Sequence, residues 1–312
     1  MGAFFHAVRV FGDELASVRW EFLALALALF FVRLCLRGVA WRVILRAAYP
    51  NERLRFRSVF GAYLAGVGVN SIAPARAGDV VKLYLVKHRM DAGSYATLAP
   101  TLLAETLLDM FVAGGFILWA ALIGALPTHE VYARLPSVDW GFFARYERET
   151  AVGLGVLASA LVIGAIAYVE HGGASRARIG RGFAILGAPR RFLIGVILPQ
   201  ALSWVLRIAA IYYFLVAFRV QASLHNALLA LVVDSLATLF PATPGGAGTK
   251  QGLIVFLFHG RAVSAPRLLA FSVGMNIAVV VFSVLLGGIS MYLMARTISW
   301  RRLQASRAAE RV

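Results

Sequence analysis

Two carboxylates, Glu105 and Asp109, stand four residues apart inside a long apolar run from Ser94 to Leu126. In an α-helix that spacing places both side chains on one face. At a rise of ~1.5 Å per residue, Glu105 lies roughly 16 Å from the start of the run. Carboxylates inside a membrane usually face a polar cavity or a cationic partner, because burying their charge is costly. We therefore expect these acids either to line a substrate path or to form a structural ion pair, with Arg207 or Arg76 as the partner.

Arg207 is itself a charged residue in apolar surroundings, near the middle of the run 192–218, and Asp234 is a further acid of this kind. An arginine without a partner at membrane depth costs several kcal/mol on even the mildest insertion scales. We expect Arg207 to contact Glu105, Asp109 or Asp234.

The stretch Asn70–Lys82, NSIAPARAGDVVK, interrupts a second apolar region. Broken backbone at membrane depth is tolerated only where protein or a water-filled cavity surrounds it. An arginine there offers a planar fork to a phosphate group, and a lysine offers a point charge. These residues either bind an anionic headgroup or form a solvated cytoplasmic loop. The candidate substrate-binding residues of this turn are Asn70, Pro74, Arg76, Asp79 and Lys82.

A second interruption, Phe240–Gly252, reads FPATPGGAGTKQG. Its backbone N–H groups could form a concave anion site, with Lys250 adding positive charge. In the alternative interpretation this is a tight turn in which glycine permits close helix approach. Two such breaks, one in each half of a chain, indicate a transporter-like binding site. The candidate residues here are Pro244, Gly245, Gly246, Gly248, Lys250 and Gln251.

Composition places the chain among integral membrane proteins. Of its 312 residues 60% are hydrophobic and only 15% are charged, against roughly a quarter charged in soluble proteins. The net charge of +16 comes from basic clusters beside apolar runs, which favours anionic lipid over nucleic acid as the partner. The six scattered histidines and the single cysteine, Cys35, predict no metal site, and the absence of a phosphate-binding nucleotide loop predicts no cofactor.

The charge distribution predicts an all-α fold with a definite topology. We expect re-entrant helical hairpins at 56–90 and 224–259, and an N-terminus outside the cell membrane. Arg33 and Arg37 should reach the interface at the end of the first spanning helix. The basic segments 37–57, 170–191 and 296–312 should be cytoplasmic, and the less basic loop 127–150 external. Five spanning helices are expected, at 20–36, 94–126, 151–169, 192–218 and 268–295.

The order of these elements indicates an inverted-topology repeat within a single membrane domain, 1–312. A unit of span, hairpin and span at 20–126 recurs at 192–295, and the helix 151–169 supplies the crossing that inverts the second copy. Residues 296–312 form a basic tail. Such repeats are common in secondary transporters.

Three stretches carry a family resemblance that covers about residues 20–295. They are NSIAPARAGD from Asn70, ETLLD from Glu105 to Asp109, and PATPGGAGTKQ from Pro241 to Gln251. With them the chain resembles the flippase-like membrane family related to the transmembrane domain of lysylphosphatidylglycerol synthases. Asp79 and Gln251 stand where that family usually has Glu, and Thr106 where Arg is common.

The resemblance implies lipid translocation. It does not imply lipid aminoacylation, because the family members with both activities carry an aminoacyl-transferase domain after the membrane domain, and we expect none in the residues up to Val312. The expected substrate is an anionic or polyprenyl-phosphate-linked lipid, and a lipid- or glycosyl-transferase is a possible partner. Two alternatives remain open. The chain could be a membrane-embedded lipid-modifying enzyme that uses Glu105 and Asp109 as acid and base, or a scaffold subunit of a lipid-synthesis complex.

Overall fold

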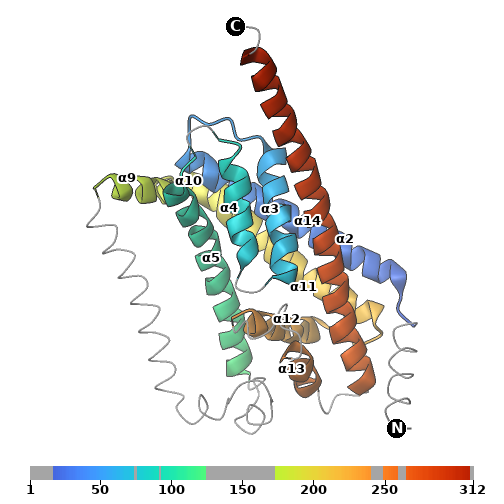
Figure 1. Ribbon diagram of the computed structural model, residues 1–312. Helices are drawn as coiled ribbons and strands as arrows, with labels where there is room; N and C mark the ends of the chain where they lie inside the picture. Colours follow the sequence, from blue (N-terminus) through green and yellow to red (C-terminus); the bar gives the residue numbers. More distant parts are fainter. Residues whose placement is uncertain are drawn as a thin grey trace.

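The protein is an all-helical, polytopic membrane protein throughout the part that its computed structural model describes (Figure 1). The described residues are 17–73, 76–90, 93–123, 173–239, 249–258 and 265–309. Within them, four runs are long and apolar enough to cross a membrane. These runs are Trp20–Ala48, Tyr95–Ala120, Pro189–Ala217 and Pro266–Arg296.

Three of these runs confirm expected spanning helices with small changes at their ends. Helix α5 extends over Tyr95–Leu122. The run Pro189–Ala217 combines α10 (Pro189–Phe192), a π-helical turn η2 (Leu193–Ile197) and α11 (Leu198–Ala217). The last helix, α14, runs unbroken over Ala265–Ala309 and so continues into the basic tail. The expected helix at 151–169 and the loop 127–150 lie outside the described residues.

The expected end of the first spanning helix is wrong. Helix α2 continues from Trp20 to Ala48, so Arg37 lies within it and not in a cytoplasmic loop. Arg37 is buried with 8% of its surface exposed, and two carboxylates of α5 neutralise it. An arginine that is compensated inside the protein does not have to reach the interface. The connection from α2 to the next helix, α3 (Phe56–Ile72), is therefore short, covering residues 49–55.

The first interruption joins two antiparallel helices, α3 (Phe56–Ile72) and α4 (Ala77–Lys87). They pack so closely that a Cβ added at Gly78 would lie 1.9 Å from the carbonyl oxygen of Gly66. The Asn70 side chain accepts a hydrogen bond from the Gly78 amide at 2.7 Å and donates one to Asp79 at 3.1 Å. The chain thus forms a helical hairpin whose turn is held by Asn70.

We expect Gly78→Ala to destabilise this hairpin by about 1–3 kcal/mol, because the new methyl group must push the two backbones apart. The melting temperature of the detergent-solubilised protein should fall. Gly114→Ala on α5 is the matched control, since a Cβ there would meet no atom within 4 Å. It should leave the melting temperature unchanged or raise it slightly. Equal melting of the two variants would show that α3 and α4 do not need this contact.

The second interruption is also flanked by two helices that pack together, α12 (Leu224–Leu239) and α13 (Thr249–Leu257). In Figure 1 this pair lies toward one end of the molecule and α3 and α4 toward the other, between α5 on one side and α14 on the opposite side. Each helix pair packs on a long helix from the other half of the chain: α3 packs on α14, and α12 packs on α5. Helix α2 packs along α11. Gly68 of α3 meets Gly287 of α14 at the first of these contacts.

The buried apolar residues of the described part of the chain form two large cores and a small one. One large core surrounds α11, α12 and α13 and includes Phe214, Leu231 and Phe258. The second large core surrounds α2 and α3 and includes Trp41 and Tyr63. The short helices α9 (Gly173–Gly182) and η1 (Ala184–Gly187) contact α5 and α2 beside the second core.

Large apolar side chains also project outward from the long helices. Phe111 and Leu122 on α5 are 83% and 79% exposed. The exposed residues Val281, Leu285 and Ile289 recur at four-residue spacing on α14 and so share one face. Surfaces of this kind suit contact with lipid, because lipid tails are as apolar as these side chains.

We expect residues 49–55 to face the cytoplasm, because they lie among basic residues. Asn51→Cys should therefore react with a membrane-impermeant maleimide in inside-out vesicles and not in intact cells. Cys35 must first be replaced by Ser, since it is a free thiol. Labelling in intact cells would reverse the orientation proposed for the whole chain.

Candidate functional site

The first polar cluster joins α2, α3 and α5 around Arg37. Arg37 Nη2 donates to Glu105 Oε1 at 2.8 Å and forms an ion pair with Asp109, while Nη1 donates to Asp109 Oδ1 at 3.0 Å. Arg37 Nε donates to the Tyr63 hydroxyl at 2.6 Å. Glu105 is only 3% exposed. The predicted common face of the two acids is confirmed, but their partner is Arg37 and not Arg207 or Arg76.

The first hairpin connects to this cluster through Tyr63 and Lys82. The Lys82 ammonium lies 4.5 Å from the centre of the Tyr63 ring and 3.1 Å from Asp79 Oδ1. Lys82 is 5% exposed, so it belongs to the packed body of α4 and not to a solvated loop. Burial alone would raise the pKa of Asp79, but the charges of Lys82 and Arg76 outweigh it and hold that pKa below its usual value.

Arg76 occupies the exposed side of the same turn. Its side chain is 58% exposed and its Nε lies 2.9 Å from Asp79 Oδ2. Its backbone is in the left-handed region, with φ of 57°. The turn therefore presents one accessible guanidinium next to a compensated carboxylate.

The second polar cluster joins α11, α12 and α13 around Asp234. Arg207 forms an ion pair with Asp234, which confirms one of the three partners expected for Arg207. Lys250 Nζ lies 2.5 Å from the other carboxylate oxygen of Asp234. The Arg207 guanidinium also lies 4.8 Å from the Trp204 ring centre. One carboxylate thus connects an arginine of a spanning run to the first turn of α13, across the second interruption.

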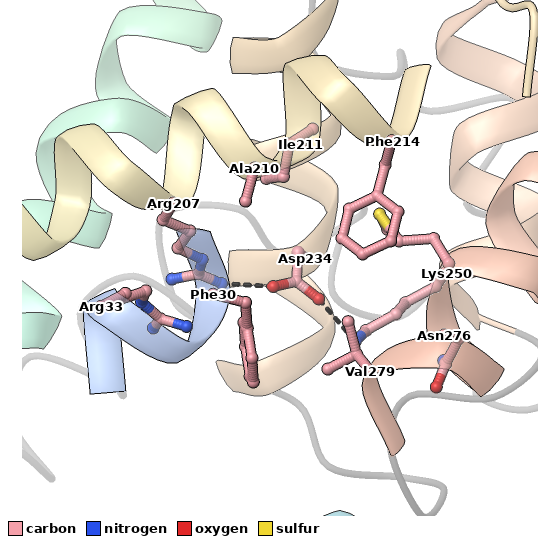
Figure 2. A pocket seen from close by; sticks show the side chains of 11 residues that line it. Phe30, Arg33, Arg207, Ala210, Ile211, Phe214, Asp234, Lys250, Asn276 and Val279 are labelled. Carbon is pink, nitrogen blue, oxygen red and sulfur yellow. Dashed lines mark hydrogen bonds and ion pairs between the residues drawn. The ribbon is translucent and has the colours of Figure 1, made fainter. Parts of the chain in front are cut away.

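A cavity of about 80 Å³ opens beside this cluster (Figure 2). Five helices line it: α2, α11, α12, α13 and α14. Its polar side is formed by Arg33, Arg207, Asp234, Lys250 and Asn276. The remaining lining residues are apolar, namely Phe30, Ala210, Ile211, Phe214, Met275 and Val279.

Arg33 is the residue of this cavity that the sequence interpretation placed wrongly, at the interface. It lies 13 residues after Trp20, near the middle of the 29-residue span, and lines the cavity beside Arg207 (Figure 2). Its Nε is buried and has no hydrogen-bond partner among the described residues. Its guanidinium lies 5.6 Å from the Phe30 ring centre.

The spacing of Arg33 and Arg37 was the signal that could have located both. They are four residues apart on α2, as Glu105 and Asp109 are on α5, so each pair shares a helix face. Arg37 forms ion pairs with both Glu105 and Asp109. Arg33 lies one helical turn away on α2 and lines the cavity.

Several predicted site residues lie outside the described part of the structure, and their role stays a prediction. Gln251 lies on α13 next to Lys250. The described residues contain no group of three His, Cys, Asp or Glu side chains suited to holding a metal ion. The undescribed candidates are Pro74, Pro244, Gly245, Gly246 and Gly248.

Comparison with known proteins identifies the family of this helical arrangement. The family model described as the lysylphosphatidylglycerol synthase TM region matches residues 2–287. The chain belongs to this family. It therefore shares a membrane domain with those synthases, as the three sequence stretches had indicated.

Curated relatives come from archaea. A UPF0104 membrane protein of Methanothermobacter thermautotrophicus is 24% identical over 308 residues, covering 89% of this chain and 85% of the relative. A second UPF0104 membrane protein of that organism is 22% identical, covering 82% and 78%. A third, from Pyrococcus horikoshii, is 27% identical over 111 residues, covering 35% and 32%. No solved structure matches the chain significantly.

Proposed function

We propose that this member of the family is a lipid translocase that moves an anionic or polyprenyl-linked lipid between membrane leaflets. The observation that carries the proposal is the cavity lined by three cations and one carboxylate among apolar helices. Charged side chains in such a setting mark substrate or ion pathways more often than they serve stability.

The position of the cavity suits a headgroup path. At ~1.5 Å per residue, Arg33 lies roughly 20 Å along a spanning helix, close to mid-depth. The acyl or prenyl tails would remain in the bilayer against the outward apolar faces, while the headgroup crosses through the polar interior. The two helix pairs would act as re-entrant hairpins of an inverted repeat, which the reciprocal packing of α3 on α14 and α12 on α5 supports.

The ion pairs that Glu105 and Asp109 form with Arg37 disfavour the enzyme alternative. Glu105 is buried, and Arg37 engages both Glu105 and Asp109. A general acid or base must reach the proton that it transfers in a substrate complex. Neither acid lines the cavity. The scaffold alternative requires no polar cavity at all.

Reconstitution of the purified protein into liposomes tests the three functions together. Fluorescent phosphatidylglycerol on the inner leaflet should become accessible to a membrane-impermeant quencher faster than in protein-free liposomes. Mass spectrometry of the same lipids should show no chemical change. A changed lipid mass would favour the enzyme, and neither movement nor change would favour the scaffold.

A further inference from the structure

We propose that Arg33 receives the phosphate group of the lipid in the cavity. The inference rests on the proposed function and names the chemical group that the site binds. Arg33 matches none of the family stretches that the sequence displays.

The first step of the argument is the difference between Arg33 and its neighbours. Arg207 and Lys250 share the Asp234 carboxylate, and Arg37 holds Glu105 and Asp109. Arg33 makes no ion pair with any described residue, and its buried Nε has no hydrogen-bond partner there. A guanidinium offers five N–H donors in a planar fork that matches phosphate oxygens.

The second step is the size and lining of the space. A cavity of about 80 Å³ has room for several water molecules or for a small anionic group. Phe30, Phe214 and Val279 are apolar parts of the lining, so an anion would bind at the cations, with Arg33 and Arg207 on one side of Asp234 and Lys250 on the other (Figure 2). A compact anion such as a phosphate group therefore finds both space and positively charged partners there.

The third step is the charge balance. Asp109 of the first polar cluster is close enough to Arg33 and Arg207 to interact electrostatically with both. The described side chains of the two clusters therefore belong to one charge system. It contains the cations Arg33, Arg37, Arg207 and Lys250 and the carboxylates Glu105, Asp109 and Asp234. Lys82, Arg76 and Asp79 join it through Tyr63. These charges, like the three cations and one carboxylate that line the cavity, leave an excess of positive charge that suits an anionic phosphate group.

Binding to the detergent-solubilised full chain tests this inference without requiring transport. The probes are dioctanoyl phosphatidylglycerol, dioctanoylglycerol and inorganic phosphate, each titrated by microscale thermophoresis. Phosphatidylglycerol should bind, and dioctanoylglycerol should not. Arg33→Gln should weaken phosphatidylglycerol binding about ten- to hundredfold, as expected for losing hydrogen bonds to a charged group.

Arg46→Gln is the matched control, because Arg46 lies exposed on the same helix α2 and the substitution removes the same charge. Its affinity should equal that of the wild type. If Arg33→Gln does not fold, Arg33→Lys and Ala210→Leu replace it. The first keeps the charge without the fork, the second fills the cavity, and both should weaken binding.

Three results would overturn the inference. The first is unchanged phosphatidylglycerol binding in folded Arg33→Gln, or in both replacement variants. The second is equal affinity for inorganic phosphate and lipid, which would assign the site to free phosphate. The third is binding of dioctanoylglycerol as tight as that of phosphatidylglycerol, which would show that the phosphate is not recognised.

The two proposals fail separately. A wild-type protein that moves no lipid but binds phosphatidylglycerol through Arg33 would refute the translocase and keep the phosphate site. A protein that moves lipid equally well with Arg33→Gln would keep the translocase and refute the phosphate site.

Discussion

Arg37→Leu is expected to remove most of the folded protein from the membrane. The substitution leaves Glu105 and Asp109 buried without their cation and removes the hydrogen bond to Tyr63. Removing one partner of a buried ion pair costs about 3–5 kcal/mol. That is a large part of a total stability on the order of 5–15 kcal/mol. Abundance and melting temperature should be measured by size-exclusion chromatography of heated detergent extracts.

The controls for Arg37 separate charge from packing. Arg46→Leu changes the same residue type at an exposed position of α2 and should melt like the wild type. Adding Glu105→Gln and Asp109→Asn to Arg37→Leu should recover part of the lost abundance, since no uncompensated carboxylate remains. If Arg37→Leu alone melts within the error of the wild type, the first polar cluster does not hold these helices together.

Arg207→Leu should have its largest effect on lipid movement. Asp234 keeps Lys250 as a partner in this variant, so the protein should fold with reduced abundance. Loss of a charge-assisted contact in the cavity should slow movement of fluorescent phosphatidylglycerol about ten- to hundredfold. Rates must be compared in liposomes that contain equal amounts of protein.

A double substitution distinguishes a functional Arg207 from a structural one. Arg207→Leu with Asp234→Asn removes both charges and leaves Lys250 an amide oxygen as its partner, so part of the lost abundance should return while lipid movement stays slow. Arg191→Leu, at an exposed position of the same helical run, should affect neither property. A double variant that recovers movement together with abundance would show that the pair only stabilises the fold.

The long apolar runs could be located from the sequence because each exceeds the length that crosses a bilayer, as for α5 and α14. The two interruptions were equally visible, since Pro and Gly stand where an unbroken helix was otherwise required. Charge patterning also suggested that Arg207 needs an acidic partner, and the structure supplies Asp234.

The identity of ion-pair partners could not be predicted in the same way. Hydropathy treats any arginine as an end signal, so the first span was cut at about residue 36 while α2 continues to Ala48. Arg37 is tolerated inside only because α5 brings Glu105 and Asp109 to it from 68 and 72 residues away. Contacts over such separations depend on helix packing, which the local pattern does not encode.

The most direct test of lipid passage through the cavity is a reversible block within one protein. Val279→Cys in a Cys35→Ser background places a small thiol in the lining (Figure 2). A charged methanethiosulfonate reagent should then fill the cavity, and a reductant should empty it again. Asn51→Cys, exposed between α2 and α3, is the labelled control. We predict that movement of fluorescent phosphatidylglycerol stops after labelling Val279→Cys and returns after reduction, while the Asn51→Cys protein is unaffected. Fully labelled Val279→Cys protein that moves lipid at the unlabelled rate would contradict a path through this cavity.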